Sequence, residues 1–314
     1  MVRRTRTNER NDYGIHEHVS VDVQQHHNVK GEGYTLLELL IALALALFLS
    51  GGIISIFLQC EKNYYLTQRL HAIQNNARIA FHWLSHDIRM AGFIGCVPLV
   101  NFFPLHSQLT PDTSLVVWHE GHTTAKFMRL PHLSRAKFHS DIVLIQSLDP
   151  NTVPVKFAKG QHISLPRRAL FHPDDKLLIS DCQHAEAFQW RDINLKYTYQ
   201  GDSEIGFLDK IIYYIGDTGR STHEGKPIHA LYRRNLNKSL HNPIELVEEV
   251  ENMSIRFGIK NGLNDNIIYV SPDQIKRGSD VRSLEVTLLF NERKSLQREW
   301  RHIIALRERE PRLC

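Results

Sequence analysis

The sequence has 314 residues, of which 42% are hydrophobic and 23% are charged, so it can bury a sizeable core and is not disordered throughout. A net charge of +4 on a chain of this length gives no basic stripe dense enough for a nucleic-acid binder, and we expect no nucleic-acid partner. Four cysteines permit one or two disulfides but exclude a small scaffold built on disulfides.

An apolar run extends from Tyr34 to Leu58 and carries a single charge. As a helix it would be roughly 37 Å long, which is enough to cross a hydrocarbon core about 30 Å thick. A buried core helix is the alternative, but the length favours a lipid span. A secretory signal peptide would be shorter and would be followed by a small-residue cleavage site, which this chain lacks after Leu58. Gly51 and Gly52 are the one place where this helix could bend.

Glu38 is the single charge of this run and needs an explanation. A lone carboxylate near the start of a lipid-facing helix costs on the order of 2–3 kcal/mol. One interpretation is that Glu38 lies at the headgroup interface and is tolerated there. The other is that it pairs with a cation from another molecule, because no Lys or Arg lies within two turns of it on the helix.

Residues 33–39, Gly-Tyr-Thr-Leu-Leu-Glu-Leu, resemble the processing motif of type IV prepilins and type II secretion pseudopilins. In that family a membrane peptidase cuts after the glycine and the new first residue is N-methylated. The resemblance therefore implies cleavage after Gly33 and a mature N-terminus at Tyr34, where the family usually has Phe. It also implies that Glu38, the fifth mature residue, neutralises the terminal ammonium of a neighbouring subunit during docking. In a medium of low dielectric such a charge pair is strongly attractive.

The same resemblance implies an orientation. The processing side would be cytoplasmic and everything after Leu58 periplasmic, so the chain would begin as a single-pass protein of the inner membrane and then enter a pilus. The basic residues before Tyr34 support this orientation only weakly. Residues 1–33 would be a leader or a cytoplasmic N-terminal extension, longer than most leaders of the family. A translation start at Val29, which leaves a five-residue leader, is favoured over a disordered cytoplasmic tail.

The helical pattern continues beyond the membrane. Apolar residues recur every three or four positions along one face, and the helix is expected to end near Gly92. The stripe consists of Leu66, Leu70, Ile73, Ala77, Ala80, Leu84 and Ile88. Residues 34–92 are thus predicted to form one helix, with a transmembrane half and an amphipathic half.

His82 and His86 are spaced as two metal ligands on a helix would be. They lie off the apolar stripe, and no third ligand is evident. We therefore expect both to be solvated or to face another subunit, and we expect no metal and no cofactor.

Seven later segments are short, apolar and bounded by turn residues, as strands are. They are residues 114–118, 141–145, 176–180, 208–214, 253–257, 267–270 and 284–290, with long polar loops expected around 120–138 and 216–228. This order predicts an α+β fold, in which the long helix packs on the antiparallel sheet of a periplasmic head formed by residues 93–314.

Within the family, the chain is most similar to the PilW type of minor pilin. The similarity rests on residues 87–93 with Cys96, on 180–182, on 213–215 with 230–233, and on 303–307. It implies a minor pilin that primes pilus assembly near the tip and so serves adhesion or twitching motility. The implied partners are the prepilin peptidase, other major and minor pilins and a tip adhesin. The J-type pseudopilin of type II secretion is the alternative, although it is usually much smaller.

A membrane-anchored periplasmic enzyme or binding protein is the alternative from another class. The sequence has no nucleophile, metal or paired-carboxylate motif in context, so we expect no enzymatic activity. Residues 216–221 faintly resemble a phosphate loop but lack its lysine, and a turn between two strands is expected there. Asn264, Asp265 and Asn266 could contact calcium, although a hairpin turn is the commoner use of such residues.

The cysteines lie in different settings. Cys60 follows the membrane span on a rigid helix, and Cys314 is the last residue of a charged tail. Cys96 and Cys182 both lie near turns of the head, where close backbone approach is easy. Because the periplasm is oxidising, we predict a Cys96–Cys182 disulfide, with four free thiols as the alternative.

Overall fold

The structure is a computed structural model and describes residues 34–96, 114–118, 133, 136–137, 139–166, 171–222, 224–237, 243–260, 266–275, 281–292 and 296–306. Two compact units meet between Tyr64 and Tyr65. Gly33, with the rest of 1–33, lies outside the described residues, as do Cys314, Asn264, Asp265 and most of the loop expected around 120–138.

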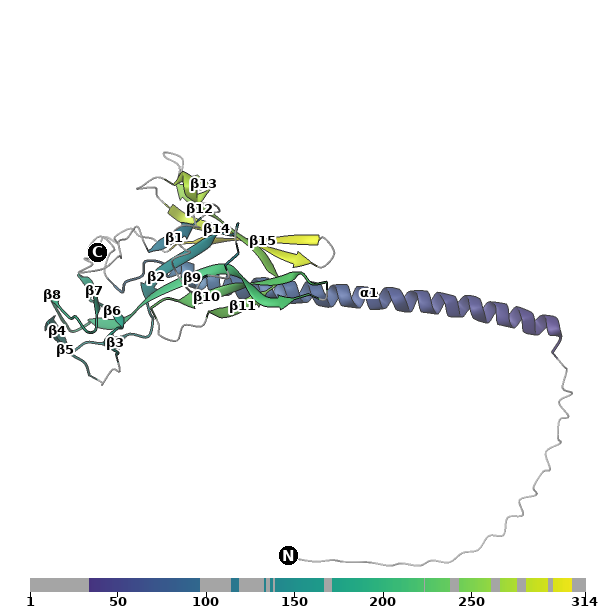
Figure 1. The fold of residues 1–314 in the computed structure, drawn as a ribbon, viewed down its shortest axis with the longest axis horizontal. Coiled ribbons are helices and arrows are strands. Elements are labelled where there is room, and N and C mark those ends of the chain that lie inside the picture. Colours follow the sequence, from purple (N-terminus) through teal and green to yellow (C-terminus); the bar gives the residue numbers. More distant parts are fainter. Residues whose placement is uncertain are drawn as a thin grey trace, which may run out of the picture. The chain divides into compact units, whose positions relative to one another are not determined.

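One continuous helix, α1 (Leu36–Arg89), runs from the first unit into the second (Figure 1). It passes through Gly51 and Gly52 without a break, which the leucine and alanine residues around them favour. At its end the chain turns at Gly92, whose φ of 75° is left-handed and therefore suits a glycine. The Gly92 N–H donates to the carbonyl of Gln146 at 2.9 Å. The long helix and its end near Gly92 are as the sequence predicts.

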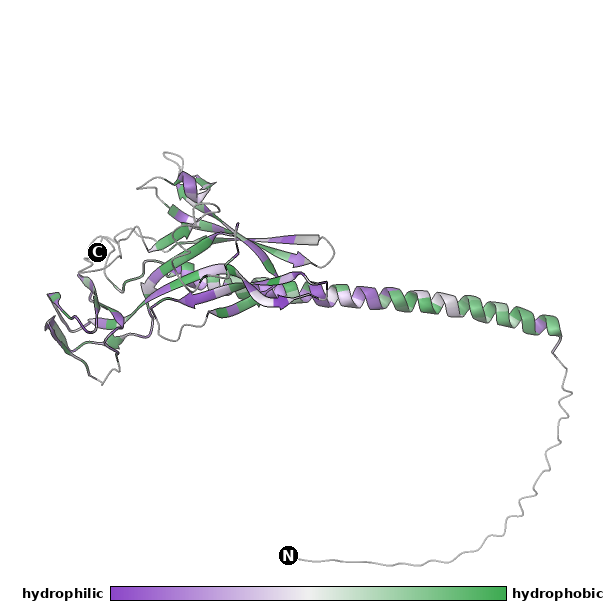
Figure 2. Cartoon of the chain, in the orientation of Figure 1, coloured by the Kyte–Doolittle hydropathy of each residue, from purple (hydrophilic) through white to green (hydrophobic). Residues whose placement is uncertain are grey.

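The described part of the first unit, residues 34–64, is exposed along its whole length. The hydropathy colouring in Figure 2 shows that this half of α1 is predominantly apolar. It is long and apolar enough to cross a membrane, and none of its most apolar stretch is buried within the chain. The helix therefore fits a single-pass membrane anchor.

The second unit holds three antiparallel sheets within the described residues (Figure 1). The eight-stranded sheet contains β1 (Leu115–Trp118), β2 (Ile142–Leu148), β3 (Val153–Pro154), β6 (Lys176–Ser180), β7 (Ala185–Gln189), β9 (Glu204–Ser221), β10 (Pro227–Asn235) and β11 (Ile244–Glu248). The four-stranded sheet has the order β13 (Ile267–Val270), β12 (Val250–Lys260), β14 (Val281–Glu292) and β15 (Leu296–Ala305). The three-stranded sheet has the order β5 (His162–Ser164), β4 (Phe157–Gly160) and β8 (Leu195–Gln200).

The α+β architecture agrees with the sequence, but the arrangement of strands is richer than one sheet. Each of the seven expected segments overlaps a strand, and 176–180 and 267–270 have the expected bounds. The loop expected at 216–228 is wrong, because β9 continues to Ser221 and β10 begins at Pro227. The 18 residues of β9 pair with β3 and β6 at positions 204–207, with β2 at 208–213 and with β10 from 211 to 221.

The amphipathic half of α1 packs in the main core. Its buried side chains join residues of the eight-stranded and the four-stranded sheets in one cluster, and burying each such large side chain contributes roughly 1.5–3 kcal/mol. The buried helix residues of this cluster are Ile73, Ala77, Ala80, Leu84 and Ile88. The expected stripe is wrong at its N-terminal end, because Leu66 is 52% exposed and Leu70 is only partly buried.

Candidate assembly interface

Thr35 and Glu38 form a capping box at the start of α1. The Glu38 N–H donates to Thr35 Oγ1 at 3.3 Å, and the Thr35 N–H donates to Glu38 Oε2 at 3.3 Å. Two backbone donors that have no intrahelical partner are thereby satisfied. In the single chain Glu38 is thus engaged with the helix end, where the macrodipole favours a negative charge. Its hydrogen-bond donors, the N–H and the hydroxyl of Thr35, are neutral and leave its charge uncompensated, so the carboxylate can still accept a cation.

The residues expected at the processing site lie just before this cap. Tyr34 is described and is 86% exposed, whereas Gly33 lies outside the described residues. From Tyr34 to Leu58 the large apolar side chains are half exposed or more. Lipid or other apolar helices are the environments in which such a surface is stable.

Asp87 is the buried polar centre of the helix–sheet contact. Its side chain is 4% exposed and lies on the last turns of α1. Asp87 Oδ2 accepts hydrogen bonds from the hydroxyl of Tyr213 on β9 at 2.6 Å and from Nε of Arg233 on β10 at 2.7 Å. His86 Nδ1 lies 3.0 Å from Asp87 Oδ1. The network ties the end of the helix to two neighbouring strands.

Charge and burial in this network shift two pKa values. Burial raises the pKa of Tyr213 well above its usual value, and the charge of Asp87 and its hydrogen bond add to the rise. For Arg233, burial alone would lower the pKa, but the hydrogen bond and charge of Asp87 outweigh burial and raise it. The Arg233 guanidinium therefore stays charged beside Asp87. The Arg233 guanidinium also lies 5.2 Å from the ring centre of Trp83, a cation–π distance.

Cys96 and Cys182 are joined in a disulfide, with their Cα atoms 4.6 Å apart. The bridge connects the segment after α1 to the end of β6. Gly95 makes the approach possible, because its φ of 93° is strained for other residues and a Cβ there would collide with the Ser180 side chain. Cys60 is a free, exposed thiol on α1.

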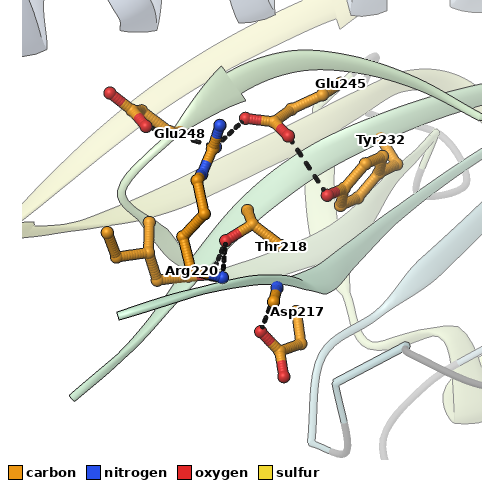
Figure 3. Close-up of polar contacts among 8 residues, drawn as sticks. Asp217, Thr218, Arg220, Tyr232, Glu245 and Glu248 are labelled. Carbon is orange, nitrogen blue, oxygen red and sulfur yellow. Dashed lines mark hydrogen bonds and ion pairs between the residues drawn. The ribbon is translucent and has the colours of Figure 1, made fainter. Parts of the chain in front are cut away.

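The segment compared above with a phosphate loop is the end of β9, so the turn expected at 216–221 is wrong. Figure 3 shows the Arg220 guanidinium between Glu245 and Glu248 of β11, and the Arg220–Glu248 distance is 3.3 Å. The Tyr232 hydroxyl donates to Glu245 at 3.3 Å from β10, the strand between them. These contacts hold three strands together, which is a structural role.

The two histidines of α1 do not come together with further ligands. His82 and His86 are both exposed, and His86 contacts Asp87. Among the residues that the structure describes, no group of three or more His, Cys, Asp or Glu side chains could hold a metal. The calcium position considered at 264–266 lies almost wholly outside those residues.

Thr35, Asp87 and Arg233 lie in segments that carry the family resemblance, but the sequence assigns none of them a role of its own. Thr35 has a detectable signal, since Thr-x-x-Glu at the start of an apolar run is the capping-box pattern. Asp87 has a weaker one, because it lies next to Ile88 at the edge of the apolar stripe. No sequence signal pairs it with Arg233, since 146 positions separate the two residues.

Comparison with known proteins links the C-terminal part of the head to a family. Residues 212–307 match the family model described as Type IV Pilus-assembly protein W, PilW. The matched region begins near the middle of β9 and includes Tyr213 and Arg233. No curated protein and no solved structure matches the chain. The match supports a PilW-type type IV pilus protein, with a part in pilus assembly and contacts with other pilus components.

Proposed function

We propose that this PilW-type type IV pilus protein is a minor pilin that primes assembly near the pilus tip and so supports adhesion or twitching motility. The observation that carries the proposal is α1 itself. The first half of this unbroken helix is exposed and apolar and has a single carboxylate at its start. The second half packs in the core of a β-rich head. A purely soluble protein would not leave so long an apolar surface uncovered.

The proposal assigns a task to each part of the chain. Residues 1–33 are a leader or cytoplasmic extension, residues 34–92 are the membrane and assembly helix, and residues 93–314 are the periplasmic head. Prepilin peptidase cuts between Gly33 and Tyr34. Before assembly, the mature protein is anchored in the inner membrane with its head in the periplasm. The PilW match supports a structural role rather than an enzymatic one.

Glu38 has two tasks in succession in this proposal. In the membrane it caps α1 through Thr35, which lowers the cost of a carboxylate near lipid. During assembly it meets the N-terminal ammonium of a neighbouring pilin, and the pair is attractive because both charges are desolvated. The partners in this step are the other major and minor pilins, and a tip adhesin is a further partner at the end of the fibre.

The proposal is tested by complementing a strain that lacks the protein. The wild-type chain should restore surface pili and should itself be found in sheared pili, whereas Gly33→Val should stay unprocessed in the membrane. Gly31→Val is the matched control, because it makes the same change two residues away and should be processed normally. A Gly33→Val chain of mature size in sheared pili would contradict the proposal.

A further inference from the structure

A groove of about 980 Å³ opens between α1 and β15 in the second unit. One wall is the face of α1 that carries Arg78, His82 and Arg89, and the other is formed by residues 300–302 of β15. Phe81 and Trp300 line it as aromatic side chains, and both are partly buried.

The groove is cationic. Arg78 and Arg89 are exposed and have no ion pair among the described residues, and Arg301 reaches Glu285 only at 3.7 Å. His82, His86 and His302 add imidazoles to the same walls, and no acidic residue is among the described residues that line the groove. The fields of these side chains therefore favour a negatively charged occupant.

One wall of the groove is also an unpaired sheet edge. β15 pairs with β14 along ten residues, from Leu296 to Ala305, and no strand pairs with its other side within the described ranges. An edge strand can accept an added strand through its outer backbone N–H and C=O groups. Two side chains of the groove have buried polar atoms without a hydrogen-bond partner in the described structure, Ser85 Oγ and Trp300 Nε1. An interface without its partner would leave such groups unsatisfied.

The spacing of the arginines fits an extended occupant. Arg78 and Arg89 are eleven residues apart on α1, which places them on one face about 16 Å apart along the helix axis. An extended chain covers that length in about five residues. Side chains that share one face of a strand are an even number of positions apart, so two carboxylates about four or six positions apart would reach both guanidinium groups, and arginine binds carboxylates in a bidentate manner.

We infer that this groove binds an extended, carboxylate-rich segment of another pilus subunit, which adds a strand to β15 and places its acidic side chains on Arg78 and Arg89. The identity of the partner as a pilus subunit depends on the proposed function, whereas the chemistry of the segment depends only on the groove. Backbone pairing would supply affinity, and the charges would fix the register.

The test uses the full chain in cells, with a photoreactive phenylalanine analogue in place of His302. A second chain carries the analogue in place of Lys159, an exposed residue of β4 that lies outside the groove, as a control for random contact. After irradiation, the covalent adducts and their cross-linked peptides are identified by mass spectrometry. We expect an adduct from position 302 to an Asp- or Glu-rich peptide of another pilin, and none from position 159 to that peptide.

Charge variants test whether the yield of the adduct from position 302 depends on Arg78 and Arg89. Arg78→Glu with Arg89→Glu should lower the yield of this adduct by about tenfold or more, and Arg78→Lys with Arg89→Lys should retain most of it. Lys156→Glu with Lys159→Glu, tested with the analogue at 302, makes the same change in net charge at exposed residues elsewhere and should leave the yield unchanged. Retention of the Cys96–Cys182 disulfide shows that each variant is folded.

Several outcomes would overturn the inference. They are adducts only with lipid, adducts only within the same chain, an adduct that Arg78→Glu with Arg89→Glu leaves unchanged, or no adduct at 302. If the protein is still recovered in sheared pili, the proposed function stands and only the groove assignment is wrong. If it is absent from pili as well, both are wrong.

Discussion

Asp87 and Arg233 are 146 positions apart in the sequence, yet the Arg233 Nε donates to Asp87 Oδ2 at 2.7 Å inside the head. Tyr213 donates to the same oxygen atom from β9, where it is the register partner of Arg233. A carboxylate that is 4% exposed on a helix is stable there only because a cation and a hydroxyl meet it. The contact therefore defines how the end of α1 joins the eight-stranded sheet.

Asp87→Ala should destabilise the head strongly. The substitution leaves the mostly buried Arg233 guanidinium and the Tyr213 hydroxyl without their acceptor, at a cost of about 3–5 kcal/mol in the free energy of unfolding. Tyr213→Phe removes one hydrogen bond and should cost about 1 kcal/mol. Urea unfolding of the detergent-solubilised chain measures both, with Asp192→Ala at an exposed position as the control. An Asp87→Ala chain as stable as the control would show that the network does not contribute to the stability of the head.

Loss of the Cys96–Cys182 bridge should also destabilise the head. The two cysteines are 86 positions apart, and in the chain-entropy model closing such a loop contributes about 4 kcal/mol. Cys96→Ser with Cys182→Ser should therefore unfold at lower urea, whereas Cys60→Ser, at an exposed free thiol, should not. Non-reducing peptide mapping checks the pairing. A Cys96 peptide that is free, or linked to Cys60, would contradict it.

The two tasks of Glu38 can be separated by three substitutions. Glu38→Gln keeps a side chain that can complete the capping box but removes the charge, so insertion should be normal and assembly should fail. Thr35→Val breaks the cap but keeps the charge, so it should weaken the helix start by about 0.5–2 kcal/mol and leave assembly largely intact. Glu38→Leu removes both functions, and it should insert in the membrane at least as well as the wild type.

The readouts for these variants are the amount of protein in the membrane and in sheared pili. Glu38→Gln at wild-type level in pili would show that the charge has no part in docking. If Thr35→Val is lost from pili as completely as Glu38→Gln, the cap and not the charge is the feature that assembly requires.

Stability should fall in acid in part through Glu251. Burial alone would raise the pKa of this carboxyl, but the hydrogen bonds and charges of Lys137 and His229 outweigh burial and lower it below its ordinary value of 4.5. A group whose pKa is lower in the folded state stabilises the fold above its unfolded pKa and loses that contribution as the pH falls through the folded pKa. The contribution should be complete at pH 6 and above (about 1.5 units over the ordinary value), and it should decline below about pH 4.5.

The measurement compares unfolding free energies at neutral and acid pH. Glu251→Gln should be less stable than the wild type at neutral pH, and the difference should shrink as the pH falls below about 4.5. Glu299→Gln, at an exposed carboxylate of β15, is the control and should follow the wild type. A difference between Glu251→Gln and the wild type that stays constant with pH would contradict the assignment.

The sequence predicts the helix well because two strong patterns coincide in it. An apolar run longer than 20 residues and a 3.6-residue stripe identify α1, and a glycine marks its end. The stripe over-extends to Leu66 because periodicity shows which residues share a face but not where the head begins. The disulfide could be predicted because compartment and position near turns left one favoured pair among four cysteines.

The bounds of the strands are harder to predict from the sequence than those of the helix, for physical reasons. β6 and β13 are short, apolar and flanked by turns, so their bounds could be predicted. β4 and β8 alternate buried and exposed residues with lysines and glutamine on the outer face, and such weak alternation resembles a loop. The extension of β9 to Ser221 was missed because Gly216 and Gly219 resemble a turn. Gly216 instead admits the rings of Tyr214 and Tyr232, which would contact a Cβ at 3.0–3.1 Å.

The mass of the N-terminal peptide of the protein from sheared pili tests the central claim most directly. The account predicts a chain that begins at Tyr34, carries one methyl group on its amino nitrogen and lacks Gly33 and every residue before it. A chain recovered only from membranes with its N-terminal residues still attached, or one cleaved after Leu58, would contradict the assignment as a processed minor pilin.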